Sequence, residues 1–131
     1  MAAVDQDDAE VLAALRRHWA VSDGGDFAAE HAIYAQGAIL EYPQSGERIR
    51  GRNNIAAARM AQPDRKRFTA QRMIGGGALW ISELVMTYDE QPMFVVSIME
   101  FEGGKVVRER QYFGAPFAPG PSRAQWVERM D

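Results

Sequence analysis

Four strand-like runs, separated by short turns, fill most of the C-terminal half of this chain and restrict what it can fold into. Each run is rich in β-branched and aromatic residues, and Gly or Pro stands in the turns between them, which predicts consecutive antiparallel strands. The runs cover residues 67–74, 79–88, 93–101 and 105–113. Strands of this length that follow helices predict a curved sheet with the helices on its concave side, and that shape encloses a pocket for a small molecule.

The N-terminal half is predicted to supply the helices and a strand hairpin. Val11, Leu15 and Trp19 recur every four residues and predict a helix from Asp8 to Ser22. The segments predicted after it are a helix ending near Gln36, strands at 38–42 and 49–52, and a helix that begins with a cap at Asn53 or Asn54 and runs to Met60. This order predicts the α+β class and one domain over residues 1–131, with a frayed end at 1–7 and a tail at 114–131.

Composition argues against several function classes. The formal net charge of −3 is not that of a nucleic-acid-binding protein. No run approaches the length and apolarity of a membrane helix, and the acidic first residues are unlike a secretory signal. The chain has no cysteine and only two histidines, His18 and His31, so we expect no disulfide, no metal site and no cofactor. These features favour a cytoplasmic protein.

Several segments carry a family resemblance that extends over nearly the whole chain. They are Asp23-Gly-Gly-Asp-Phe27 between two helices, Ile39-Leu-Glu-Tyr-Pro43, Gly51-Arg-Asn-Asn-Ile55 and Gly103-Gly-Lys-Val-Val107. In this combination the chain resembles the nuclear transport factor 2-like superfamily, which includes ketosteroid isomerases and SnoaL-like polyketide cyclases. The resemblance implies a cone-shaped, mixed or antiparallel sheet wrapped around N-terminal helices. The segments 41–51, 112–117 and 123–128 are similar to a bacterial SnoaL-like subgroup whose members are mostly uncharacterised.

The resemblance also implies which positions correspond to the catalytic residues of steroid isomerases. The oxyanion-hole tyrosine of their first helix corresponds to His18, the general-base aspartate to Tyr42, and a protonated aspartate on the third meander strand to Ser97. All three chemical groups differ in this chain. Because a phenol with an ordinary pKa of about 10 is a poor base at neutral pH, we do not expect steroid isomerase activity.

Alternation along the strands assigns each side chain to one of two faces. The resemblance places inward the set Trp80, Ser82, Leu84, Met86 and Tyr88, and also the set Val95, Ser97, Met99 and Phe101. On the last run, Arg108 and Arg110 fit an outer face, which leaves Val107, Glu109, Gln111 and Phe113 inward. A β-bulge would reverse this assignment.

Glu109 is the carboxylate with most reason to be reactive, because a carboxylate in an apolar cavity is costly unless it is paired or hydrogen-bonded. In a catalytic role it would be the base for proton transfer next to a carbonyl, with His18 and Tyr42 donating hydrogen bonds to the enolate oxygen. Alternatively, Glu109 pairs with an arginine and serves only the fold, and His18 is an ordinary core residue. The predicted ligand-binding residues are Trp19, Tyr34, Trp80, Leu84, Met86, Ser97, Met99, Gln111 and Phe113.

Three functions fit these features. The first is a cofactor-free isomerase or cyclase acting on a cyclic or polyketide-like molecule, the second is a binding protein with the same pocket, and the third is an adaptor that uses only the sheet face. The outer set is too apolar to face water, because it contains Leu79, Ile81, Phe94, Val96 and Ile98. We therefore expect a homodimer through this face, although a C-terminal tail that folds back would also cover it.

Overall fold

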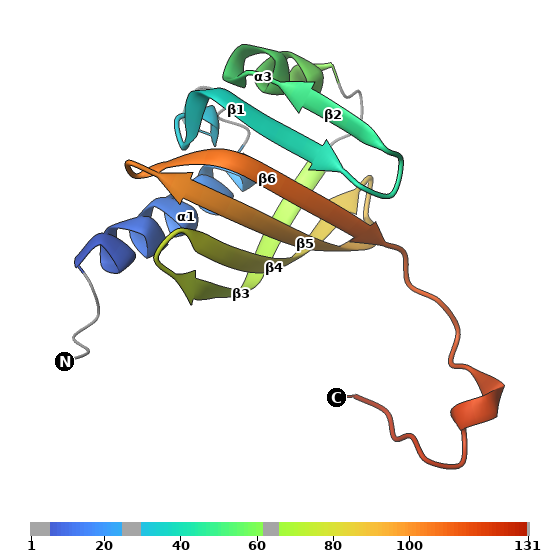
Figure 1. Cartoon of the computed structure of the whole chain (residues 1–131). Coiled ribbons are helices and arrows are strands. Elements are labelled where there is room, and N and C mark those ends of the chain that lie inside the picture. The colour runs from blue at the N-terminus through green and yellow to red at the C-terminus, as the bar shows by residue number, and fades with distance from the viewer. Residues whose placement is uncertain (1–5, 25–29, 62–65, 131) are drawn as a thin grey trace.

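A computed structural model describes residues 6–24, 30–61 and 66–130 of the chain. The elements in chain order are α1 (Gln6–Gly24), β1 (Tyr34–Tyr42), β2 (Glu47–Arg50), α3 (Arg52–Met60), β3 (Lys66–Gly76), β4 (Leu79–Tyr88), β5 (Gln91–Glu102), β6 (Lys105–Gly114) and the short 3-10 helix η1 (Pro121–Arg123) (Figure 1). The four strands of the predicted meander all form, with bounds within two residues of the prediction. None of the described helices is long and apolar enough to cross a membrane.

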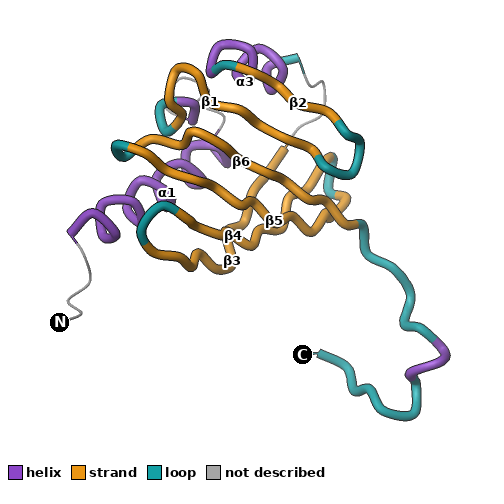
Figure 2. The backbone as a smooth tube through the Cα atoms, viewed as in Figure 1, coloured by secondary structure: helices purple, strands orange, loops and turns teal. Residues whose placement is uncertain are grey.

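One six-stranded sheet, in the order β2-β1-β6-β5-β4-β3, forms the body of the molecule (Figure 2). Neighbouring strands are antiparallel except β1 and β6, which are parallel. The α+β prediction is confirmed, and the parallel pair makes the sheet mixed. Because β1 comes early in the chain and β6 late, their pairing closes the sheet around the helices.

The helices cover the inner face of the sheet, as predicted. Helix α1 packs against β3, and α3 packs against β1 and β2. The side chains of Leu15 and Trp19 are buried on the apolar face of α1, and Trp19 Nε1 donates a hydrogen bond to Ser82 Oγ on β4 at 3.1 Å. These contacts fix α1 across the sheet and leave the region beside α3 less filled.

The predicted inner sets of β4 and β5 are confirmed, because their described members are buried while the alternate residues are partly or fully exposed. The side chain of Tyr88 is outside the described part of the chain. On β6, a bulge lies between the pair Glu100–Arg108 and the pair Phe101–Val106. It turns Val106 inward and leaves Val107 only half-buried, so the inward prediction for Val107 is wrong. Beyond the bulge, Glu109 and Gln111 face inward as predicted.

The segment before α3 differs from the prediction in two places. Much of the predicted second helix lies outside the described residues, and its end is wrong, because β1 already begins at Tyr34. The early start follows from pairing with β6, where Val106 N donates to Ile33 O at 2.9 Å. Helix α3 begins at Arg52 rather than after an asparagine cap, and its N-cap is Gly51 at φ 93°. A positive φ of this kind strains any residue with a Cβ.

The two ends of the chain also differ from expectation. Residues 1–5 lie outside the described part, and α1 begins at Gln6, two residues before the predicted start. The tail leaves the sheet after Gly114 and runs away from the body (Figure 1). Its large apolar side chains, among them Phe117 and Trp126, are exposed, so the alternative in which the tail covers the outer face of its own chain is wrong.

Candidate functional site

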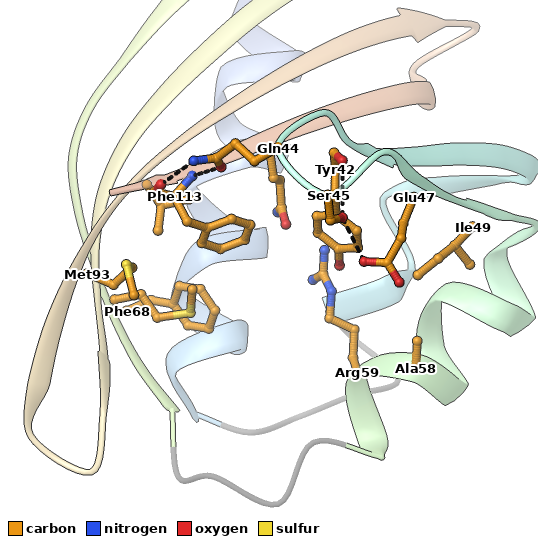
Figure 3. A pocket seen from close by; sticks show the side chains of 13 residues that line it. Tyr42, Gln44, Ser45, Glu47, Ile49, Ala58, Arg59, Phe68, Met93 and Phe113 are labelled. Carbon is orange, nitrogen blue, oxygen red and sulfur yellow. Dashed lines mark hydrogen bonds between the residues drawn. The ribbon is translucent and has the colours of Figure 1, made fainter. Parts of the chain in front are cut away.

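A cavity of about 620 Å³ lies between the β1–β2 hairpin, α3 and the inner face of the sheet (Figure 3). Its apolar lining consists of Ile49, Ala58, Phe68, Met86, Met93, Val95 and Phe113, and its polar lining consists of Tyr42, Gln44, Ser45, Glu47, Arg59 and Gln111. A mostly apolar wall with a few convergent polar groups is the usual composition of a small-molecule site. The predicted pocket is therefore present.

The wall at the end of β6 is held in place by reciprocal hydrogen bonds. Gln44 Nε2 donates to Phe113 O at 2.6 Å, and Phe113 N donates to Gln44 Oε1 at the same distance. The rings of Tyr42 and Phe113 lie 6.0 Å apart and are tilted by 41°. Nearby, Ser45 Oγ donates to Glu47 Oε1 at 2.6 Å. The hairpin loop is thus fastened to the sheet and gives the cavity a preformed polar edge.

The guanidinium group of Arg59 brings a buried positive charge to the cavity. It extends from α3 towards Tyr42 (Figure 3), and only 7% of the residue is exposed. Its Nη1 lies 3.0 Å from Glu30 Oε2, and its Nη2 lies 3.8 Å from Glu109 Oε1. Burial lowers the pKa of Arg59, but Tyr34, Glu109, Tyr42 and Glu30 outweigh burial and raise it. Arg59 is therefore a permanently charged hydrogen-bond donor.

Glu109 lies behind this wall and is fully buried. One carboxylate oxygen accepts a hydrogen bond from the hydroxyl of Tyr34. The other accepts from Ser97 Oγ at 2.5 Å and from Gln111 Nε2 at 2.8 Å. The prediction that Glu109 lies inside the cone beside polar side chains is confirmed. The carboxylate also faces an arginine, as the alternative prediction required, and it does not line the cavity itself.

Both tyrosines of the site are hydrogen-bond donors rather than bases. Burial, followed by the charge of Glu109, raises the pKa of Tyr34 well above its ordinary value. Burial also raises the pKa of Tyr42, although Arg59 opposes the shift. Both phenols therefore keep their protons at neutral pH. Tyr42, which lines the cavity, is the phenol that a ligand can reach.

His18 is neutral and does not line this cavity. Burial, followed by the positive charge of Arg59, lowers its pKa to about 3. Because its Nδ1 lies 2.7 Å from the carbonyl oxygen of Glu30, the neutral ring carries its proton on Nδ1 and donates it there. His18 instead lines a separate cavity of about 400 Å³ beside Arg17 and Lys105. The prediction that His18 and Tyr42 share one wall is wrong, because the Nδ1 hydrogen bond holds the ring towards Glu30.

The other predicted ligand-binding residues separate into three groups. Met86, Gln111 and Phe113 line the cavity. Tyr34 and Ser97 bind Glu109 behind it. Trp19, Trp80, Leu84 and Met99 are buried but do not line the main cavity, so the prediction that Trp80 shares a wall with Tyr42 is wrong. The indole Nε1 of Trp80 donates to Gly77 O at 3.1 Å, and this hydrogen bond holds the side chain at the far end of the sheet, away from the cavity.

Several residues of the candidate site are absent from the sequence prediction. Arg59 and Glu30 form the buried ion pair, and Phe68 and Met93 line the cavity. A signal for Arg59 exists, because it follows Ile55 by four residues and therefore shares the buried face of α3. Among the residues that the structure describes, no group of three His, Asp or Glu side chains is arranged to hold a metal ion.

Comparisons with known proteins agree with this geometry. The SnoaL-like domain family matches residues 2–109 of the chain. An NTF2-like protein of unknown function from Burkholderia xenovorans is 47% identical, with a TM-score of 0.89 over 95% of this chain and 98% of that chain. A putative ketosteroid isomerase from Kribbella flavida is 24% identical, with a TM-score of 0.86 over 94% and 91% of the two chains. An epoxide hydrolase from M. tuberculosis is 21% identical, with a TM-score of 0.69 over 80% and 83%. None of the curated proteins matches.

Proposed function

This chain belongs to the SnoaL-like domain family, and from that premise we propose that it binds a small, mainly apolar molecule, ring-shaped or polyketide-like, that carries a carbonyl oxygen. One observation carries the proposal. The guanidinium of Arg59 and the phenol of Tyr42, both protonated donors, meet at one side of a mostly apolar cavity. Solved structures with the same fold include proteins described as a putative ketosteroid isomerase and as an epoxide hydrolase.

The charges around the cavity favour a neutral ligand over an anion. Arg59 is already paired with Glu30 and faces Glu109, so its positive charge is balanced before any ligand enters. Glu47 adds a further carboxylate to the lining. An anionic ligand would meet net negative charge, whereas a neutral carbonyl oxygen can accept hydrogen bonds without bringing a charge of its own.

The open cavity also favours ligand binding over a role as an adaptor. A protein that used only its sheet face would have no need for an empty interior, and the lining here leaves space for a molecule of two or three rings. No cofactor is required for binding of this kind.

A matched pair of alanines in α3 tests where the ligand binds. Ala58 lines the cavity, whereas its exposed neighbour Ala57 does not. We expect 2-acetylnaphthalene to bind to the unmodified protein and to the Ala57→Trp variant with similar affinity. In Ala58→Trp the indole occupies the cavity, so the dissociation constant should rise at least about tenfold, which isothermal titration calorimetry measures. Equal binding to both variants would place the ligand elsewhere and refute the proposal.

A comparison of two probes tests the hydrogen-bond donors of the cavity. 2-Ethylnaphthalene has a similar shape to 2-acetylnaphthalene but no oxygen, so it should bind more weakly to the unmodified protein. Tyr42→Phe should reduce that preference by the value of one hydrogen bond, roughly 0.5–1.5 kcal/mol. An unchanged preference in Tyr42→Phe would remove the phenol from the site.

Proton transfer next to the carbonyl is the second candidate function, and the placement of Glu109 favours it. The carboxylate lies directly behind Gln111, which lines the cavity and donates to it. If Gln111 turned aside, Glu109 could take a proton from the carbon next to the carbonyl, while the new enolate oxygen accepted hydrogen bonds from Arg59 and Tyr42. Return of the proton to a different carbon of a conjugated enolate, or to its opposite face, would complete an isomerisation, whereas return to the same carbon gives only hydrogen exchange. Deuterium incorporation into the methyl group of 2-acetylnaphthalene in D₂O, followed by NMR, measures this step.

A further inference from the structure

One carboxylate of the cavity lining has no basic partner within the described chain. Glu47 is the exposed first residue of β2, and it lies on the polar side of the cavity. No lysine or arginine among the described residues forms an ion pair with it. Its neighbour Arg48 points to the opposite face of the hairpin, where Nη2 lies 2.8 Å from Glu41 Oε2. Glu47 therefore brings an uncompensated negative charge to the cavity.

The β1–β2 hairpin places this carboxylate beside the phenol of Tyr42. Tyr42 and Glu47 are directly opposite each other in the antiparallel register, and the next pair is Glu41 with Arg48. Directly opposite residues share one face of a sheet, with Cβ atoms about 5 Å apart. Figure 3 shows the Glu47 carboxylate on the same side of the cavity as the phenol and the side chain of Arg59. A ligand whose carbonyl meets Tyr42 therefore comes within reach of Glu47.

One oxygen of Glu47 is held in place and the other is open. Ser45 Oγ donates a hydrogen bond to Glu47 Oε1 at 2.6 Å, which orients the carboxylate. No donor within the described chain binds Oε2. Because an ionised carboxylate only accepts hydrogen bonds, Oε2 is available to a donor that a ligand supplies.

The other charges around the cavity do not balance Glu47. Among the described residues that line the cavity, Arg59 is the only cation, and its guanidinium is already shared between Glu30 at 3.0 Å and Glu109 at 3.8 Å. Three carboxylates and one guanidinium leave a net negative charge. Glu47 also lies close enough to contribute to the raised pKa of Tyr42, behind the larger effect of burial. A positive group on the ligand would complete the charge balance.

We propose that Glu47 selects a ligand that carries a protonated amine close to its carbonyl group, with the ammonium at Glu47 and the carbonyl at Tyr42 and Arg59. This inference rests on the proposed function and narrows its ligand class to amino ketones. An ammonium group supplies both the positive charge and the N–H donor, whereas a hydroxyl supplies only the donor. The rings of Tyr42 and Phe113, whose centres lie 6.0 Å apart, add aromatic faces that attract a cation.

Two ketones of the same shape test this preference. The amino ketone is 2-naphthyl 3-(dimethylamino)propyl ketone, whose amine is protonated at neutral pH. The reference is 2-naphthyl 4-methylpentyl ketone, in which a CH group replaces the charged NH group. Isothermal titration calorimetry measures the dissociation constants of both. The ratio of the two constants separates the contribution of the charge from that of the naphthyl ketone.

Glu47→Gln is the matched change, because glutamine keeps the size and an acceptor oxygen but removes the charge. In this variant the affinity for the amino ketone relative to the reference should fall at least about threefold, the value of a solvent-exposed ion pair. Glu102→Gln removes the same charge from an exposed position at the end of β5, outside the cavity, and should keep the ratio. Added salt should reduce the preference for the amine in the unmodified protein more than in Glu47→Gln.

The outcomes distinguish this inference from the proposed function. If the unmodified protein binds neither ketone, both are overturned. If it binds both ketones and Glu47→Gln leaves the ratio of their affinities unchanged, the proposed function stands and the amine is refuted. An equal fall of the ratio in Glu102→Gln would assign the preference to the net charge of the protein and would also overturn the role of Glu47.

Discussion

Arg59→Met is expected to be among the most destabilising single changes in this protein. Arg59 is the cation between two buried carboxylates, with Nη1 at 3.0 Å from Glu30 and Nη2 at 3.8 Å from Glu109. Methionine retains most of the aliphatic stem but removes the charge, so both carboxylates stay buried with less compensation. Removal of one partner from a buried ion pair costs about 3–5 kcal/mol. Urea denaturation should therefore show a midpoint lower by roughly 2 M, for a slope of about 2 kcal/mol per molar urea.

Two further variants identify the cause of that loss. Arg50→Met removes an exposed arginine from the neighbouring strand and should change the free energy of unfolding by no more than about 0.5 kcal/mol. Adding Glu30→Gln to Arg59→Met removes one uncompensated charge and should restore part of the stability. A loss of less than about 1 kcal/mol in Arg59→Met, or no recovery in the double variant, would refute the view that the guanidinium neutralises this cluster.

Three other predictions concern single groups. Glu109→Gln should keep the fold and the binding of 2-acetylnaphthalene and, if the protein catalyses proton transfer, should slow deuterium incorporation about a hundredfold. For His18, whose pKa in the folded protein is about 3, the ring should show no titration by NMR between pH 5 and 8. Because the unfolded chain takes up this proton near pH 6.5, stability should fall as pH is lowered from 6.5 towards 3, and His18→Gln should flatten that slope in urea titrations. Arg67, followed by the backbone of Phe68, lowers the pKa of Asp23, so Asp23→Asn should destabilise the protein at pH 7 but not once the pH falls through that lowered pKa.

The strand meander was predictable because its signals are local. Alternation over β4 and β5 identified Ser82, Leu84, Ser97 and Met99 as inward residues, and a glycine pair marked the tight turn between β5 and β6. Gly103 and Gly104 both adopt positive φ there, at 58° and 79°, which is the conformation a two-residue hairpin of this kind requires. The alternation of side chains along the strands and the residues in the turns were therefore enough to predict most of the fold.

The site was less predictable because it depends on contacts between distant parts of the chain. The early start of β1 at Tyr34 follows from parallel pairing with β6, and no local pattern reports a partner so far along the sequence. The bulge at Val107 likewise appears only in the register of β5 against β6. Arg59 was missed because a charged residue on a short helix is usually exposed, and only its spacing from Ile55 indicates a buried face.

The arrangement around Glu109 would link stability to the proposed ligand recognition. Its carboxylate holds Gln111 and faces Arg59, and both of these polar groups line the cavity, Gln111 from β6 and Arg59 from α3. Tyr34 and Ser97 complete its hydrogen bonds on the buried side. Whether Glu109 only orients these donors or also takes a proton depends on Gln111, because that amide stands between the carboxylate and the cavity. Under the proposed function, a ligand whose carbonyl competes for Gln111 would uncover the Glu109 carboxylate when it binds, so that binding and proton transfer would both depend on Gln111.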